Sequence, residues 1–435
     1  MRHSIPLLVP MLVLAFAGCA TAPASKPPLA TVVRPEPAPS PAASPPPPAK
    51  ALPEIGIGGY FASNNIYAKR DYQVADIPAS KLTTIYYAFL KIDADFTLTF
   101  YDRNADIVKK LPDDPPGLGY RGSFAQLQLL KKQYPKLRVI GSVGGGNMSD
   151  MFSPMVATLA TRKAFVDSAL AFMRKYGLDG LDLDWEFPVT GGQPGVPHDP
   201  EDGRRLTKLL GEMRRAFDAA ATADGRSYYL GLTVSPNPGY GKYLEIGAMA
   251  STVDFLNIMT YDYHGAWDAM SGHLAPLFAS PEDPGFKWEA TKKMNVAGAV
   301  QYYIERGMDP RKLHIGIPLY GIGAQLAVGL KKPLFAPKVE KATLKETGVM
   351  DYASVQRLVA GGTHPNWDEG AHAPYLYQPD TGLFVSYGDG RSVTEKVELV
   401  ADKGLGGVFF WELSQDRGGD LVNFTVWTIG RLKPR

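Results

Sequence analysis

The sequence predicts an α/β fold: a parallel (β/α)8 TIM barrel with a small α+β insertion between its seventh and eighth strands. Three observations lead to this prediction. Eight short apolar runs recur along the chain, helical patterns separate them, and the segment between the last two runs is too long for one helix. Parallel strands need long crossover connections, usually helices, and eight such strands close into a barrel.

The eight predicted strands are mostly continuous in apolar character, as strands covered on both faces should be. In order they are Ile55–Phe61, Thr83–Leu90, Arg138–Val143, Gly180–Phe187, Tyr228–Ser235, Val253–Tyr261, His314–Tyr320 and Gly407–Leu413. The clearest helix follows Asp199 and Pro200, an N-cap residue and a residue favoured at the first helical position. The apolar residues after them recur at the three-four spacing of one buried face: Leu206, Leu209, Leu210, Met213 and Phe217.

The segment before the eighth strand predicts the insertion. Residues 323–395 contain the strand-like pieces Pro374–Gln378 and Leu383–Tyr387 together with Gly-rich turns. We therefore expect a small α+β domain at 323–395, set within a barrel that spans residues 53–435.

Composition excludes several classes of protein. With 45% hydrophobic and 21% charged residues, the chain of 435 residues is neither disordered throughout nor a polytopic membrane protein. The charge is 46 Lys+Arg against 44 Asp+Glu, a net of +2, which gives no electrostatic footprint for nucleic acid. The single cysteine excludes an internal disulfide framework and a Cys-based zinc site.

The first 52 residues have the pattern of an export signal and a linker. A basic start is followed by the apolar stretch Ile5–Ala17, which is too short to span a bilayer permanently. Small residues then precede Cys19 and resemble a bacterial lipobox, so residues 1–19 are predicted to be a lipoprotein-type signal peptide with Cys19 lipidated. The alternative is an ordinary signal peptide that is cut nearby.

Residues 20–52, rich in Pro and Ala, are predicted to be a disordered linker, since such a composition cannot bury a core. We expect an exported protein of the cell envelope, either an outer-membrane-anchored lipoprotein or a secreted protein. Ala20 favours the outer membrane, because an Asp at this position of the lipoprotein pattern favours retention in the inner membrane.

The run from Asp179 to Glu186 alternates acidic and apolar residues. In a strand, the period of two places Asp182, Asp184 and Glu186 on one face, which in a barrel is the interior. Burial and like charge raise the pKa values of such carboxyls, so Glu186 at the mouth could keep the proton that a general acid needs. The alternatives are a divalent-metal site, which would need more oxygen ligands, and a solvated edge strand, which the alternating Leu residues oppose.

This run fits D-G-x-D-x-D-x-E and resembles the chitinases of glycoside hydrolase family 18. Other segments agree in order and spacing: Gly59–Phe61, Asp76–Thr83, Tyr87–Phe89, Ser142–Gly145 (S-x-G-G), Met259–Asp262 (M-x-Y-D), Gly316–Gly321 and Gly404–Leu413. Trp367-Asp368 and Pro374-Tyr375 resemble the inserted domain of the family. The resemblance covers about residues 55 to 416.

The resemblance implies cleavage of β-1,4-linked N-acetylglucosamine chains with retention, the substrate's own acetamide being the nucleophile. Glu186 would then protonate the glycosidic oxygen and later activate water. Asp184 would orient and stabilise the acetamide, and Asp182 below it would tune the proton that the two aspartates share. Tyr261 would donate its hydroxyl to the acetamide oxygen.

The resemblance also implies substrate-binding residues. Asp262 would bind the sugar near the scissile bond, Trp411 would form the floor of the site, and Trp267 would contact the substrate. The positions that would line the barrel below are Tyr60, Phe89, Met259 and Ser142, with Gly145 beside them. For these positions core packing is an alternative role, and Gly145 could serve only a close backbone approach.

The chain departs from the family pattern where Gly146 and Asn64 stand at positions that often carry a Trp, and where Ile322 replaces a common Arg. The expected substrate is therefore chitin or, better, soluble chito-oligosaccharides. The alternatives are a family 18 hydrolase of peptidoglycan or N-glycan cores, and a non-catalytic chitin-binding, lectin-like protein. We expect a monomer with no cofactor, no metal and no nucleic-acid partner, and with membrane contact only through the N-terminal anchor.

Overall fold

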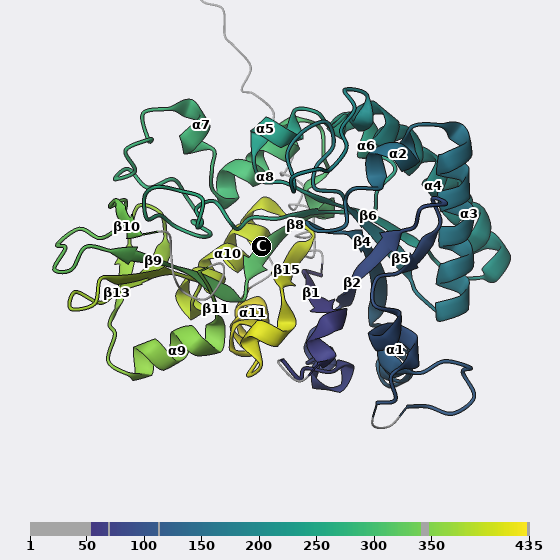
Figure 1. Cartoon of the computed structure of the whole chain (residues 1–435), viewed down its shortest axis with the longest axis horizontal. Coiled ribbons are helices and arrows are strands. Elements are labelled where there is room, and N and C mark those ends of the chain that lie inside the picture. Colours follow the sequence, from purple (N-terminus) through teal and green to yellow (C-terminus); the bar gives the residue numbers. More distant parts are fainter. Residues whose placement is uncertain (1–53, 68–69, 112–113, 341–347, 433–435) are drawn as a thin grey trace, which may run out of the picture. The chain divides into compact units, whose positions relative to one another are not determined.

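The computed structural model describes residues 54–67, 70–111, 114–340 and 348–432 (Figure 1). The predicted signal peptide, lipidation site at Cys19 and linker lie outside these residues. Within the described ranges, no helix combines the length and the apolar character that crossing a membrane requires.

Eight parallel strands close into a barrel, as predicted. They are β1 (Gly56–Ala62), β2 (Thr84–Ile92), β4 (Arg138–Gly144), β5 (Gly180–Asp184), β6 (Tyr229–Val234), β7 (Phe255–Ile258), β8 (Leu313–Pro318) and β15 (Gly407–Trp411). The order β1-β15-β8-β7-β6-β5-β4-β2 is closed by direct pairing of β1 with β2. A short strand that the sequence did not predict, β3 (Leu98–Phe100), pairs antiparallel with β2.

Helices connect the strands. They are α1 (Gly122–Gln133), α2 (Phe152–Val156), α3 (Leu159–Tyr176), α4 (Asp202–Asp224), α5 (Pro238–Gly241), α6 (Ile246–Met249), α7 (Glu289–Lys292), α8 (Val296–Glu305), α10 (Gly390–Lys403) and α11 (Asp420–Arg431). Short turns of 3₁₀ helix lie at Ser63–Ile66, Val74–Asp76, Ala79–Lys81, Pro310–Lys312 and Leu413–Asp416, and one π turn lies at Asn104–Val108.

Helix α4 buries the predicted face but begins later than predicted. Its five periodic apolar residues are completely buried, and Gly225 ends it in the left-handed conformation with φ +62°. The helix starts at Asp202, so Asp199 is not its N-cap. Instead, Asp199 accepts a hydrogen bond from the backbone N–H of Glu201, and its own N–H donates to the Asp202 carboxylate, which closes a turn before the helix.

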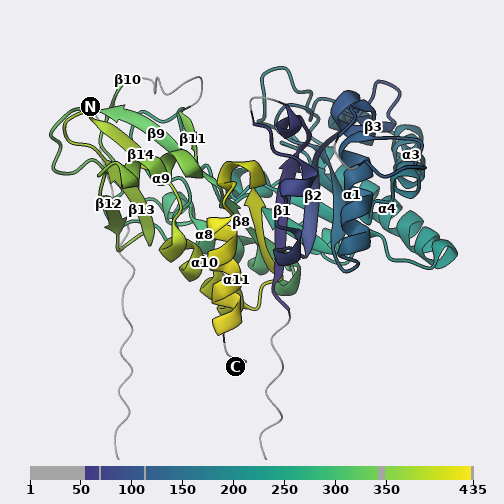
Figure 2. The ribbon, with the colours of Figure 1, turned by 90° about the horizontal axis from the view of Figure 1, so that it is seen from below.

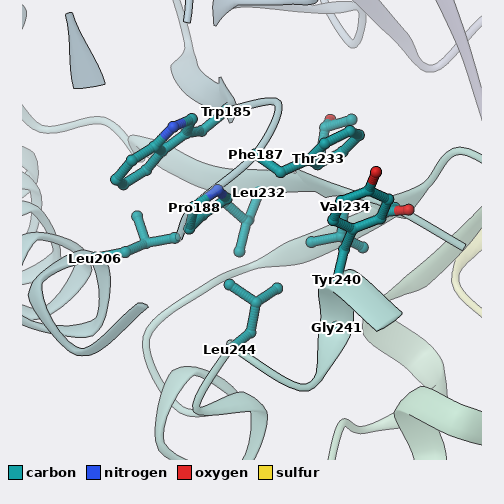
Figure 3. Close-up of a pocket in the computed structure, with 11 residues that line it drawn as sticks. Trp185, Phe187, Pro188, Leu206, Leu232, Thr233, Val234, Tyr240, Gly241 and Leu244 are labelled. Carbon is teal, nitrogen blue, oxygen red and sulfur yellow. The ribbon is translucent and has the colours of Figure 1, made fainter. Parts of the chain in front are cut away.

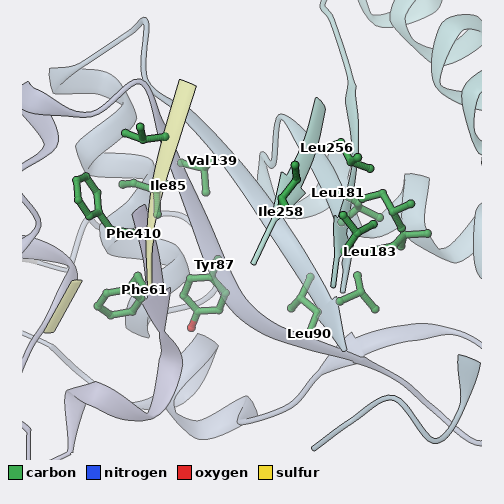
Figure 4. Packing of buried hydrophobic residues seen from close by; sticks show 14 of the residues in the cluster. Phe61, Ile85, Tyr87, Leu90, Val139, Leu181, Leu183, Leu256, Ile258 and Phe410 are labelled. Atoms are coloured by element: carbon green, nitrogen blue, oxygen red, sulfur yellow. The ribbon is translucent and has the colours of Figure 1, made fainter. Parts of the chain in front are cut away.

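The barrel has two cores, one on each face of its sheet. Outward-facing aliphatic and aromatic residues of the strands pack against the helices, as Figure 4 shows for Phe61, Ile85, Tyr87, Leu90, Val139, Leu181, Leu183, Leu256, Ile258 and Phe410. The barrel interior holds a separate, more aromatic cluster around Tyr60, Tyr86, Phe255 and Phe409. Because side chains alternate along a strand, one strand can contribute to both layers, as β1 does with Phe61 outside and Tyr60 inside.

A six-stranded antiparallel sheet is inserted between the seventh and eighth barrel strands (Figure 2). Its strands are β9 (Tyr320–Leu326), β10 (Lys338–Glu340), β11 (Val349–Asp351), β12 (Pro365–Asp368), β13 (Ala373–Tyr377) and β14 (Leu383–Ser386), and α9 (Tyr352–Ala360) packs on it. The Leu274 N–H, in the loop after β7, donates to the Ser386 hydroxyl at 2.8 Å. In the same loop, the His273 Nε2 atom lies 3.0 Å from the Asp368 carboxylate.

The outer core predicts a clear difference between two leucines. Leu209 of α4 is fully buried and Leu159 of α3 is 66% exposed. We expect Leu209→Ala to lower the free energy of unfolding by about 2–5 kcal/mol, because it removes buried methyl groups and leaves a cavity. Urea unfolding followed by circular dichroism measures this, with Leu159→Ala as the control that should change little. Equal losses in the two variants would contradict the assignment of this core.

Candidate active site

A cleft of about 320 Å³ opens at the carboxyl ends of the barrel strands. Its lining comes from the loops that follow β5, β6 and β7: Glu186, Phe187, Ser235, Pro236, Asn237, Tyr240, Met259, Tyr261, Asp262, Tyr263, Trp267 and Met294. In a parallel barrel this end gathers side chains from several loops around one point. The acidic run of β5 therefore leads directly to the cleft.

Asp182 lies at the centre of the barrel with no solvent exposure. The hydroxyls of Tyr60 and Ser142 each donate to its Oδ2 atom at 2.9 Å, and the Thr233 hydroxyl lies 3.0 Å from both carboxylate oxygens. These three donors come from β4 and β6, which pair with β5, and from β1, which does not. Burial raises the pKa of Asp182 to about 6, and the hydrogen bonds limit that rise because they favour the charged form.

Asp184, one step further along the same face, is 4% exposed and poorly partnered. Its Oδ1 atom has no hydrogen-bond partner among the described residues. Burial, then the charges of Glu186 and Asp182, raise its pKa well above the ordinary value. Asp184 is therefore a buried acid with an acceptor left for a substrate group.

Glu186 lies beyond the end of the strand, because β5 stops at Asp184 and not at Phe187 as predicted. The loop after β4 ends the strand: the Gly145 N–H donates to the Asp184 carbonyl at 2.8 Å, and the Ser149 hydroxyl accepts from the Glu186 N–H at 2.9 Å. These contacts fix the backbone of Glu186 at the cleft.

Trp185 lies between Asp184 and Glu186 in the sequence, and its side chain points into the outer core. There it stacks on Phe152 with the ring centroids 5.2 Å apart. Burial, then the charge of Asp262, raise the pKa of Glu186 to about 7. The carboxyl can thus hold a proton near neutral pH and still release it.

Gly145 allows the loop after β4 to approach Phe89 of β2 closely. Its φ is +79°, which favours glycine, and a Cβ there would lie 2.6 Å from the ring of Phe89. The next residue, Gly146, leaves space beside the acid, since a Cβ on it would lie 3.7 Å from the Glu186 Oε1 atom.

Tyr261 and Asp262 form the side of the cleft after β7. Tyr261 is 8% exposed, and burial together with the charges of Asp184 and Asp262 raises the pKa of its hydroxyl well above the ordinary value. It therefore remains a hydrogen-bond donor at any working pH. The Tyr320 hydroxyl donates to Asp262 at 2.6 Å and holds this carboxylate, whose backbone has the left-handed φ of +57°.

Three aromatic side chains pack together in the barrel interior. The ring of Trp411, at the end of β15, lies 5.3 Å from that of Tyr60 and 5.6 Å from that of Phe89. Both the edge-to-face contact with Trp411 and the hydrogen bond to Asp182 hold Tyr60 in place. Trp267 is different, because it lines the cleft wall with 67% of its surface exposed.

The outer side of the β5–α4 loop is apolar (Figure 3). Trp185, Phe187 and Pro188 pack there over Leu232 and Val234 of β6 and Leu206 of α4, and the ring of Phe187 stacks on Tyr240 at 4.5 Å. The space left between them is about 10 Å³, which accommodates at most one water molecule. This space is therefore too small for a sugar ring.

Comparisons with known proteins show the family to which this chain belongs. The model of the glycosyl hydrolases family 18 matches residues 56–416. The chain belongs to this family. It is 35% identical to Chitinase A1 of Niallia circulans over 86% of its own length, and it spans 58% of the length of that relative. It is 33% identical to Chitinase 1 of Aphanocladium album, covering 83% of this chain and 81% of that protein.

The solved structure of chitinase ChiA74 from Bacillus thuringiensis superposes with a TM-score of 0.81 at 33% identity, over 88% of this chain and 70% of that one. That chitinase has the same barrel fold, and the family match spans the barrel strands together with the inserted sheet.

Thr233, Ser149 and Tyr320 contact the acidic residues in this family 18 barrel but were not singled out from the sequence. Thr233 carries the one hydroxyl among the residues of β6 from Leu230 to Val234, which is a signal that strand periodicity could have used. Ser149 and Tyr320 act through loop and strand-end geometry that periodicity does not give. Within the described residues, no group of three or more His, Cys, Asp and Glu side chains could hold a metal ion.

The raised pKa of Glu186 predicts a dependence of stability on pH. The folded carboxyl keeps its proton up to about pH 7, whereas an unfolded Glu loses it near 4.5. The native state binds more protons in this window, so the unfolding free energy of the wild type falls as pH rises through it. Glu186→Gln has no carboxyl to ionise here, so its unfolding free energy does not fall in this way. We therefore expect the variant to gain unfolding free energy relative to the wild type, with no gain below pH 4.5 and a gain that grows up to about pH 7.

Urea unfolding across this pH range measures the difference between wild type and variant. Glu369→Gln, whose side chain is 77% exposed, is the matched control and should follow the wild type at every pH. A pH-independent effect of Glu186→Gln would show that Glu186 is not a buried proton holder.

Proposed function

We propose that the protein is a chitinase that hydrolyses β-1,4 linkages between N-acetylglucosamine units by a substrate-assisted, retaining mechanism. The observation that carries this proposal is the Glu186 carboxyl at the cleft, with its pKa raised to about 7 and two further acids behind it. Family membership and chitinase-named relatives support the substrate class. Soluble chito-oligosaccharides are the proposed substrates.

Glu186 acts first as the acid. Its proton passes to the glycosidic oxygen while the bond from that oxygen to the anomeric carbon breaks. The acetamide oxygen of the same sugar attacks the anomeric carbon and forms an oxazolinium ion, so no protein nucleophile is needed. The Glu186 carboxylate then takes a proton from water, which opens the oxazolinium ion on the face that the leaving group occupied.

Asp184 and Tyr261 stabilise the acetamide as it reacts. The free Oδ1 acceptor of Asp184 would bind the acetamide N–H and stabilise the positive charge that develops there. The Tyr261 hydroxyl would donate to the acetamide oxygen and hold it in line with the anomeric carbon. Both groups lie in low dielectric surroundings, where such interactions are stronger than in water.

Asp182 controls the number of protons on the acids. Asp182 and Asp184 cannot both ionise cheaply when buried side by side, so the pair carries one negative charge in the reactive state. The donors around Asp182 stabilise that charge. The acidic limb of the activity profile then reports the pH at which the pair takes a second proton, and the alkaline limb reports proton loss from Glu186.

Binding rests on fewer aromatic platforms than the family pattern provides. Trp411 at the floor and Trp267 on the wall would stack on sugar faces, and Asp262 would bind a hydroxyl near the scissile bond. Gly146 and the exposed Asn64 offer no stacking surface. Each missing platform weakens binding of long chains by roughly 0.5–1.5 kcal/mol, which favours short, soluble substrates.

The decisive experiment is hydrolysis of chitotetraose by wild type and Glu186→Gln. We expect turnover by the wild type and a kcat at least about 1,000-fold lower for the variant, because the glutamine amide cannot donate the proton. Glu369→Gln should keep wild-type kcat. No turnover by the wild type, or equal turnover by wild type and Glu186→Gln, would contradict the proposal.

Proton NMR of the first products tests substrate assistance, which requires the β-anomer to appear initially; initial α-anomer would exclude retention. Digestion of purified murein and of a high-mannose glycopeptide under the same conditions separates the alternative substrates from chitin.

We also propose that the protein is exported and lipidated at Cys19, on the basis of its N-terminal sequence. In a bacterial host fed an alkyne fatty acid, we expect the wild type to be labelled and to fractionate with membranes. Cys19→Ala should lose both properties, and Ser25→Ala should keep them. An unlabelled wild type found in the soluble fraction would contradict the anchor and leave export by an ordinary signal peptide.

A further inference from the structure

A column of polar side chains runs through the barrel interior from Asp182 toward the amino-terminal end. The Tyr60 hydroxyl donates to Asp182, and the Nδ2 atom of Asn257 donates to the Tyr60 oxygen at 3.2 Å. At the next step, the Nδ1 atom of His314 lies 3.2 Å from the Oδ1 atom of Asn257. Tyr86 joins the column from the side, since its hydroxyl donates to the same Asn257 oxygen at 3.4 Å.

The hydrogen bonds of this column all point toward Asp182. An amide oxygen only accepts, so His314 must be the donor and its Nδ1 atom must carry the proton. With that oxygen satisfied, the Asn257 amide presents its N–H to the Tyr60 oxygen. The Tyr60 proton is then free to be donated to the carboxylate. Asn257 is completely buried and Tyr60 is 1% exposed, so no bulk water competes for these groups.

The column ends at a cavity of about 270 Å³ on the opposite side of the barrel from the cleft. His314 lines it together with residues at the starts of β1, β2 and β4, among them Gly56, Thr84 and Arg138. The imidazole ring is fixed there. It lies parallel to the ring of Phe255, with centroids 5.8 Å apart, and a Cβ on Gly406 would lie 2.8 Å from its Nε2 atom.

Burial, and then the positive charge of Arg138, lower the pKa of His314 to about 4. The other charged residues that line the cavity are Arg311, Glu54 and Asp254. Arg311 binds Asp309, and Asp254 binds Arg214. His314 therefore remains neutral at the pH at which the carboxyls work, and a neutral imidazole with the proton on Nδ1 suits this column.

We propose that His314 and Asn257 are positioning residues for the reaction: from the far end of the barrel they orient the Tyr60 hydroxyl onto Asp182. This inference rests on the proposed function, because it concerns the charge that the Asp182–Asp184 pair carries. Without the His314 donor, the Asn257 oxygen keeps only the longer bond from Tyr86 at 3.4 Å, so the Asn257 amide and the Tyr60 hydroxyl are held less firmly in direction. The charged form of Asp182 is then less stabilised, and the pair takes its second proton at a higher pH.

Two substitutions of His314 separate hydrogen bonding from packing. His314→Phe keeps a ring against Phe255 and loses the donor, whereas His314→Asn loses the ring but keeps an amide N–H near the Nδ1 position. We expect His314→Phe to lower kcat about 3- to 10-fold, to leave KM within about twofold, and to move the acidic limb of kcat/KM upward by about half a pH unit. His314→Asn should restore most of kcat and the wild-type limb.

A packing role predicts the reverse order, with His314→Asn the more damaged variant, and that result would overturn the proposal. So would an unchanged acidic limb in His314→Phe. Thr84→Val, which alters the same cavity away from the column, is the matched control and should keep the wild-type profile. Thermal unfolding of each variant shows what fraction of the protein is folded in the assay, and kcat is expressed per folded molecule.

A second measurement does not depend on activity. In protein with ¹⁵N-labelled histidine, the His314 signals, assigned by their loss in His314→Phe, should show a neutral ring protonated on Nδ1 at pH 7. Protonation on Nε2 would overturn the column even in an active enzyme. A wild type with the Nδ1 proton but no chitotetraose hydrolysis would contradict the proposed function and leave the column standing.

Discussion

The burial of one carboxylate at the barrel axis is the constraint on which the site depends. Asp182 has no solvent exposure, and a carboxylate in such surroundings is tolerable only when donors surround it. Hydroxyls from Tyr60, Ser142 and Thr233 meet this need, and they arrive from three different strands. The register of the barrel therefore has to be right before the acidic run can be accommodated. The same register places Asp184 beyond Asp182, and the loop after β4 holds Glu186 next along the chain. Burial and the charges of neighbouring carboxylates raise the pKa values of both.

The outer core contributes mainly to the stability of the fold, and the inner core holds the polar groups around the acidic residues. The outer layer between strands and helices is aliphatic and aromatic, and it gives the fold most of its apolar burial. The inner layer combines aromatic rings with hydroxyl, amide and carboxyl groups. Polar groups inside the barrel would be costly without hydrogen-bond partners, and side chains of other barrel strands supply those partners. Changes in the outer core should thus reach the site mainly through the positions of the strands.

Much of the fold could be predicted from the sequence, and the reasons are local. Each of the eight apolar runs became a barrel strand, and the periodic face of α4 is buried as predicted. The ends of elements were less predictable. Strand β5 stops at Asp184, because Gly145 and Ser149 of the loop after β4 form hydrogen bonds with the backbone of Asp184 and Glu186. Periodicity along one strand carries no information about such partners.

The candidate site follows the same rule. The acidic run and the family motifs point to residues that line the cleft, namely Glu186, Met259, Tyr261, Asp262 and Trp267. The contacts of Thr233, Tyr320 and the Asn257–His314 pair depend instead on which strands are neighbours.

The contacts between the inserted sheet and the loop after β7 have a consequence for exchanging parts between barrels. That loop carries Tyr263, Trp267 and Met294 into the cleft, and Leu274 and His273 tie it to Ser386 and Asp368 of the insertion. One wall of the cleft is thus held in place by a segment far away in the chain. In a chimaera that receives the inserted sheet alone, His273 and the Leu274 amide would lose their partners Asp368 and Ser386. The loop and the sheet form one cassette, and recombination between relatives should conserve them together.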